Sequence, residues 1–95
     1  MNTNDQPKGI VLQVAGMVMP GQVTKVSITA PDDNRYAVSV FDLAGRILIN
    51  LIDEPLRKDE TRITELNTAD FKSGVYIIKA ISPTQVKALK LNILN

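Results

Sequence analysis

Cysteine and histidine are both absent from this chain of 95 residues. Without cysteine there is no disulfide framework, no thiolate nucleophile and no zinc–thiolate site. Without histidine the chain lacks the commonest general base near neutral pH and the commonest transition-metal ligand. Its acidic residues fall mostly in predicted loops, so a pair of catalytic carboxylates across a cleft is not expected. We predict that the chain is not an enzyme and uses no metal or cofactor.

A concentrated basic patch and a long apolar run are also missing. Lys and Arg number 11 against 10 Asp and Glu, and the basic residues are scattered along the chain. Phosphate binding needs a clustered basic footprint, so nucleic acid is not an expected partner. No window approaches the roughly 20 apolar residues that span a bilayer. The first residues, Met1–Lys8, lack the basic-then-apolar order of a secretory signal.

The composition that is present is typical of one soluble globular domain, with 44% hydrophobic and 22% charged residues. Residues 1–8 offer no apolar side chain after Met1 and end beside Pro7. They are predicted to be a disordered leader. A single domain is predicted over residues 9–95.

Short segments rich in β-branched residues recur along this domain, separated by turn signals of Gly, Pro, Asn and Asp. Several alternate apolar and polar side chains, which predicts that Val26, Ile28, Val38 and Val40 face inward. No segment has helical periodicity of useful length. The predicted strands are residues 10–15, 24–29, 36–41, 46–51, 61–66, 75–81 and 86–93.

About seven short strands at this spacing predict an all-β fold, an immunoglobulin-like β-sandwich of antiparallel strands, with a partly open barrel as the alternative. Segment 75–81 is apolar on both faces through Ile78 and is therefore predicted to be a central strand. Segment 53–60 is charged and contains Pro55, which predicts an exposed connection. Residues 67–71 have room for one turn of helix, capped by Asn67 or Thr68.

Two strands carry further predictions about which side chains share a face. Ile47, Ile49 and Leu51 alternate with other residues and are predicted to lie on one face. In the last strand Lys90 and Asn92 are predicted to face outward. The inward residues of that strand are Leu89, Leu91 and Ile93.

Asp42, Gly45 and Arg46 place a carboxylate, a glycine and a guanidinium together, which is compatible with a ligand site. A hairpin needs the same residue types, because Asp accepts backbone N–H bonds in turns and Gly adopts positive φ. We interpret them as a structural turn. Asp42 and Arg46 are expected to pair across it.

The run Asp32–Asn34 supplies three consecutive oxygen-bearing side chains, as in a fragment of a calcium loop. It lacks the alternating spacing and the distant bidentate Glu of a high-affinity site. A plain turn is therefore the favoured interpretation, with weak calcium binding as the alternative.

Gly74 and Tyr76 begin the predicted central strand. In immunoglobulin-like sandwiches a Tyr near this point fixes a corner by bonding an upstream backbone group. Tyr76→Ala is accordingly expected to cost about 3–5 kcal/mol, as truncation of a core aromatic does.

Three segments together carry a resemblance to a known family. Residues 38–46 resemble a strand ending in Asp-x-x-Gly-Arg, and residues 66–78, with Phe71 before Gly74, resemble a Leu-x-x-Gly-Val-Tyr segment. Residues 86–93 resemble a final lysine-containing strand. From about residue 21 to residue 93, the chain is similar to the C-terminal sorting domain of the type IX secretion pathway of Bacteroidetes.

The resemblance implies a seven-stranded sandwich that ends secreted cargo, is recognised by outer-membrane secretion components and is often removed after export. It also implies a location from the periplasm to the outer membrane or cell surface, as part of a longer precursor. The sequence departs from the family in two places. The Pro-Asn-Pro motif is replaced by Met19–Gln22, and the final residues Asn92–Asn95 include no basic residue.

The mechanism we predict is docking of a protein partner on the last strand, since an edge strand offers unpaired N–H and C=O groups. The alternative is a retained structural module that mediates protein association or self-assembly. The predicted partner-binding residues are Val86, Lys87, Leu89, Lys90, Leu91, Asn92 and Ile93.

Overall fold

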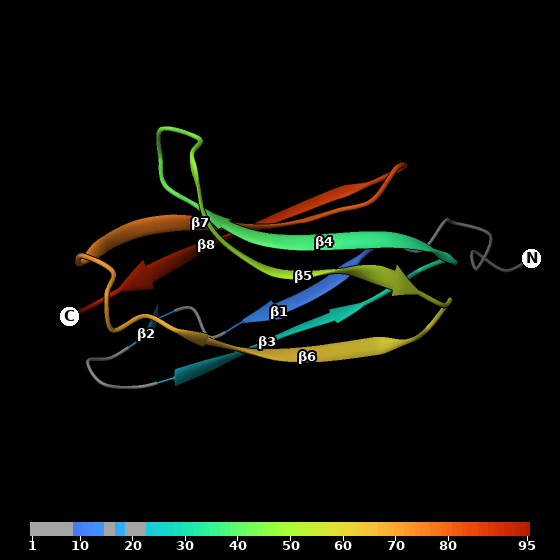
Figure 1. Cartoon of the computed structure of the whole chain (residues 1–95), viewed down its shortest axis with the longest axis horizontal. Helices are drawn as coiled ribbons and strands as arrows, with labels where there is room; N and C mark the ends of the chain where they lie inside the picture. The colour runs from blue at the N-terminus through green and yellow to red at the C-terminus, as the bar shows by residue number, and fades with distance from the viewer. Residues whose placement is uncertain (1–8, 15–16, 19–22) are drawn as a thin grey trace, which may run out of the picture.

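The computed structural model describes residues 9–14, 17–18 and 23–95, which form two β-sheets packed against each other (Figure 1). The predicted leader, Ala15 and the segment Met19–Gln22 lie outside the described residues. No helix occurs within the described ranges. The strands are β1 (Val11–Val14), β2 (Met17–Val18), β3 (Val23–Thr29), β4 (Asn34–Phe41), β5 (Ile47–Leu56), β6 (Thr61–Asn67), β7 (Gly74–Ile81) and β8 (Val86–Ile93).

One sheet has the strand order β1-β3-β6 and the other has the order β2-β8-β7-β4-β5. All pairings are antiparallel except that of β2 with β8, which is parallel and only two residues long. The predicted immunoglobulin-like sandwich is therefore confirmed, and β7 lies between β8 and β4 as a central strand. The short strand β2 was not predicted, because two residues are too few for a recognisable alternation.

The core lies between the two sheets and follows the period of two along each strand. Val26 and Ile28 from β3 and Val38 and Val40 from β4 have no exposed surface, which confirms that they face inward. Tyr36 extends the same face of β4 and is also fully buried. The other buried apolar residues are Ile10, Leu12, Ala30, Ile52, Leu56, Leu66, Ile78, Ala80, Leu91 and Ile93.

The prediction that Ile47, Ile49 and Leu51 share a face was wrong. Two bulges place extra residues in β5 relative to β4, so Ile49 is opposite Val40 while Ile47 is opposite Phe41. Val40 and Phe41 are neighbours on one strand and therefore point to opposite faces. Ile47 lies on the outer face with 57% of its surface exposed, whereas Ile49 and Leu51 pack against the core.

The predicted exposed connection over residues 53–60 was wrong for its first half. Strand β5 continues to Leu56, which is buried. Pro55 does not end the strand, because β5 is an edge strand and the missing N–H of a proline costs little where no further strand pairs. The connection is confined to residues 57–60 and is held to the core residue Ala30 by two backbone hydrogen bonds.

Residues 67–71 form a hydrogen-bonded turn and not the predicted turn of helix. The backbone N–H of Phe71 donates to the carbonyl oxygen of Thr68 over 3.0 Å. The side-chain oxygen of Asn67 accepts a 3.0 Å bond from the N–H of Ala69. Asn often makes this local bond two residues along the chain, and it favours a turn over a helix.

Candidate functional site

The edge of β8 is the feature that the sequence singled out for partner binding. On one side β8 pairs with β7 along its whole length, from Val86 opposite Ile81 to Ile93 opposite Gly74. On the other side β2 pairs only with Asn92 and Ile93. Across the described residues, no strand pairs with that side of residues 86–91. This stretch therefore presents unpaired backbone N–H and C=O groups along an open edge.

The side chains of β8 divide between the two faces as predicted. Leu91 and Ile93 are 0% and 1% exposed, and Leu89 is half-buried against the core. Lys90 is exposed on the opposite face and Asn92 is half-buried. The buried residues Leu91 and Ile93 therefore anchor the strand, and a partner can reach them only through their backbone.

Lys87 has an unusual place on this edge. It lies opposite the buried residue Ala80, on the face of β8 that carries Leu89 and Leu91, and yet it is exposed. A charged side chain on the inward face of an edge strand opposes uncontrolled pairing with other strands. The open edge therefore carries a charged side chain on its inward face.

Tyr76 fixes the corner at the start of β7. Its hydroxyl donates a 2.6 Å hydrogen bond to the carbonyl oxygen of Lys72, which is the type of bond expected from the sequence. Its ring lies 5.3 Å from that of Phe71 in a tilted arrangement. Gly74, the third residue singled out near this corner, is the first residue of β7. These contacts fix the turn before β7, and β8 pairs with β7 along its length.

A second tyrosine makes a matching contact at the other end of the fold, and sequence reasoning missed it. The fully buried Tyr36 donates through its hydroxyl to the backbone oxygen and to the carboxylate of Asp32. Burial is the main reason that the pKa of Tyr36 rises to about 12, and the hydrogen bond and charge of Asp32 add to it. The spacing of four residues is the same as in the Tyr76–Lys72 pair, and that spacing was the available signal.

The side chains of the run Asp32–Asn34 make hydrogen bonds within the protein. Besides Tyr36, the carboxylate of Asp32 accepts a 3.1 Å bond from the Asn34 amide. The carboxylate of Asp33 accepts a 2.6 Å bond from the backbone N–H of Lys58. These bonds are those of a plain turn that joins two loops.

Asp42, Gly45 and Arg46 form the turn between β4 and β5, which projects from the body of the molecule (Figure 1). One carboxylate oxygen of Asp42 accepts 2.9 Å bonds from the N–H groups of Ala44 and Arg46, and the other accepts from the Arg46 guanidinium at 2.9 Å. Gly45 has a φ of 88°. The backbone bond from Arg46 is the largest of the effects that lower the pKa of Asp42. The carboxylate is occupied by the turn, which supports the structural interpretation.

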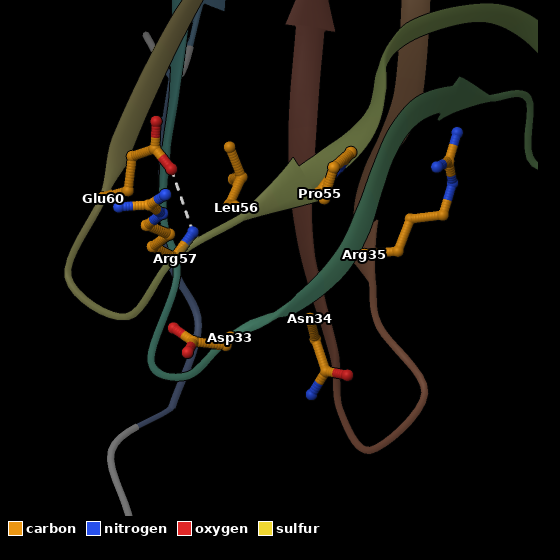
Figure 2. A pocket seen from close by; sticks show the side chains of 7 residues that line it. All are labelled: Asp33, Asn34, Arg35, Pro55, Leu56, Arg57 and Glu60. Carbon is orange, nitrogen blue, oxygen red and sulfur yellow. Dashed lines mark hydrogen bonds between the residues drawn. The ribbon is translucent and has the colours of Figure 1, made fainter.

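A pocket of about 470 Å³ lies where β4 begins and β5 ends (Figure 2). The only hydrogen bond drawn between its residues joins the N–H of Arg57 to the Glu60 carboxylate at 2.9 Å. The side chains of Asn34 and Arg35 point away from each other (Figure 2). The polar groups of these two residues therefore do not converge on a common point, as those of a ligand site usually do.

Comparison with known protein families shows which family this chain belongs to. Residues 21–94 match the secretion system C-terminal sorting domain. The chain belongs to this family. The sorting domain is thus a type IX sorting signal, of the kind carried by secreted or cell-surface proteins that pass the outer membrane. The family is one of sorting signals and is non-catalytic.

Other comparisons add the fold and no more. No curated protein matches the chain. Among solved structures, the CARDB domain of a Pyrococcus furiosus protein, crystallised in complex with di-metal ions, is similar with a TM-score of 0.55 and 13% identity. The similarity covers 90% of this chain and 86% of the other. No helix in the described part of the sorting domain is long and apolar enough to cross a membrane.

Proposed function

We propose that the sorting domain is recognised by outer-membrane components of the type IX machinery, which add a strand to the open edge of β8. The observation that carries this proposal is the side of residues 86–91 with which no described strand pairs, in a segment within the family match. Strand addition supplies a partner with several main-chain hydrogen bonds and leaves specificity to the neighbouring side chains.

The exposure of the β8 side chains supports a contact centred on the first part of the strand. Val86, Lys87 and Lys90 are exposed and Leu89 is half-buried, so their side chains flank the incoming strand. Leu91 and Ile93 hold β8 on the core, and β2 already pairs with Asn92 and Ile93. The contact therefore centres on residues 86–90.

Deleting the whole strand is a poor test, because it removes two core side chains and unfolds the domain. A pair of proline substitutions, Lys87→Pro and Ala88→Pro, is sharper. Successive N–H groups of a strand point to opposite sides, so one of these changes removes an outward N–H and the other removes a bond to β7. Thermal unfolding identifies the outward one as the variant that keeps the melting temperature closer to that of the unchanged domain.

The export assay uses a reporter fused ahead of the domain in a bacterium with a working type IX pathway. We expect the unchanged fusion to reach the medium or cell surface, and the stable proline variant to lose most of this export. The reporter without the domain is the negative control. Retention of the unchanged fusion inside the cell, or full export of the stable proline variant, would show that the edge of β8 is not the recognition element.

A further inference from the structure

The outer face of the five-stranded sheet, on the side away from the core, carries several exposed apolar side chains. The register of β4, β5, β7 and β8 places large apolar side chains there on either side of the row that contains Ser39 and Lys79. Ile47, Val75, Ile81 and Val86 are 57%, 36%, 38% and 64% exposed. An apolar face of this kind, spread over several strands, is typical of a binding surface.

The same face has a positive charge that no acidic side chain of the described residues balances. The half-buried Lys79 and the exposed Lys90 lie on it as diagonal neighbours, since Lys79 is opposite Ala88, two residues before Lys90. The acid on this face among the described residues is Asp53, and a 2.9 Å ion pair with Arg35 neutralises it. From Phe71 to Asn95 the sequence contains four lysines and no Asp or Glu.

The outer face of the other sheet also carries exposed apolar side chains, since Val11, Val23 and Ile63 are 48%, 50% and 60% exposed there, but it differs in charge. There Lys25 lies opposite Glu65, and Ser27 and the hydrogen-bonded pair Thr29–Thr61 line the adjacent positions. Among the described residues, this face is therefore close to neutral. The combination of exposed apolar side chains and unbalanced lysines is thus particular to the sheet that contains β8.

We propose that this outer face, centred on Lys79, Lys90 and Ile81, binds a protein surface that presents carboxylates around an apolar centre. The inference rests on the proposed function, and it adds a second contact beside the edge of β8. Charge complementarity argues for this occupant, because carboxylates of the partner would offset the repulsion between the two lysines. Burial of the apolar side chains of both surfaces on contact would add to the binding free energy.

Two other occupants fit the face less well. A second copy docked symmetrically, face to face, would bring lysines against lysines, which is unfavourable. Binding to anionic lipid is worth about 1 kcal/mol for each basic residue near the surface, and polybasic sites use clusters of 4–8. Two lysines are too few for such binding.

Lys79 is the decisive position, because it lies on the central strand β7 and not on the edge. We would compare Lys79→Glu, Lys79→Arg, Lys90→Glu and Lys58→Glu in the reporter export assay. Lys58 is exposed in the connection after β5, outside this face, and its substitution changes the net charge by the same amount. The ammonium group of Lys79 lies 4.8 Å from the centre of the Phe41 ring, so Lys79→Arg preserves both the charge and this contact.

We expect Lys79→Glu and Lys90→Glu to lower export at least fivefold, while Lys79→Arg and Lys58→Glu leave it unchanged. Thermal unfolding checks that each variant is folded. If Lys79→Glu is unfolded, the result for the exposed Lys90, together with Lys79→Gln, decides the question. Full export of the folded variants overturns this inference and leaves the proposed function standing, whereas failure of the unchanged fusion to be exported overturns both.

Binding measurements on the purified domain separate the occupants. In sedimentation with phosphatidylglycerol vesicles, we expect no binding. Binding that Lys90→Glu abolishes would assign the face to a membrane and overturn the inference.

Light scattering is expected to show a monomer, and a dimer that Lys79→Glu dissociates would assign the face to a second copy. A photo-crosslinking amino acid at Ala88 should give a protein adduct in exporting cells, and the same residue at Gln13, on the other sheet, should not.

Discussion

The hydroxyl of Tyr36 donates a 3.2 Å hydrogen bond to the carbonyl oxygen of Asp32, and it also bonds the carboxylate of that residue. Tyr36 is fully buried near the start of β4, so this one side chain joins the core to the turn before the strand. The same relation between Tyr76 and Lys72 holds the start of β7 at the other corner. Two tyrosine hydroxyls thus fix two of the turns that set the position of the five-stranded sheet.

We expect Tyr36→Phe to destabilise the domain by about 1.5–3 kcal/mol, the usual value of a hydrogen bond to a charged group. The pKa of Tyr36 is raised from 10.0 to about 12, so its contribution is full below pH 10 and is lost as the pH rises through 12. Denaturant unfolding at pH 8 and in a series up to pH 12 measures both effects. Equal stability of the two proteins at pH 8 would contradict the role given to this hydroxyl.

For the second tyrosine, Tyr76→Phe and Tyr76→Ala separate the hydroxyl from the ring. Tyr76 is half-buried, so we expect the alanine variant to cost about 3 kcal/mol, the lower end of the range for core aromatics. The phenylalanine variant keeps the contact with Phe71 and should lose about 1 kcal/mol. A melting temperature unchanged by Tyr76→Ala would show that the corner does not depend on this residue.

The sequence predicted the strands well where one face is buried and the alternation is unbroken. Strands β3 and β4 are such cases, since a slip of one residue would expose the whole apolar set. The prediction failed on β5, where Ile47 and Ile49 are separated by a bulge that depends on pairing with β4. A bulge depends on how two strands pair, so it could not be predicted from the sequence of β5 alone.

The candidate site shows the same limit. The place of β8 at the end of the sequence predicted an open edge. The alternation of apolar and polar residues predicted which of its side chains face inward and outward. The charge on the outer face of the sheet was not predicted, because it arises only when β7 and β8 pair and bring Lys79 beside Lys90. The bond of Tyr36 to Asp32 depends likewise on the direction in which the chain enters β4.

The turn between β4 and β5 predicts a specific dependence on pH. The pKa of Asp42 is lowered, chiefly by the N–H of Arg46, so the carboxylate stabilises the fold above its ordinary pKa of 3.8. This contribution is lost as the pH falls through the lowered value. Asp42→Asn should therefore lower the melting temperature at pH 7, and the difference from the unchanged domain should close at lower pH. Asp42→Ala, which also loses the backbone bonds, should remain less stable throughout, and a constant difference for Asp42→Asn would exclude a role for the charge.

Core and edge positions of β8 should respond differently to truncation. Leu91 is fully buried, so Leu91→Ala should cost about 2–5 kcal/mol. Val86 is 64% exposed, and Val86→Ala should change stability by less than about 0.5 kcal/mol. Urea unfolding of the two variants measures this contrast. Similar losses at both positions would mean that β8 is not packed on the core as its alternation indicates.

The charge of Lys87 opposes pairing of other strands with the open edge of β8. Replacing Lys87 tests whether this edge can pair with another strand. In Lys87→Val the inward face of the strand becomes apolar along its length, and the charge that opposes pairing is gone. We expect this variant to self-associate at concentrations where the unchanged domain is monomeric, as measured by light scattering. Lys58→Val, a matched loss of charge in the connection after β5, should stay monomeric. If Lys87→Val is monomeric and folded at high concentration, the edge does not accept a strand, and docking through β8 fails with it.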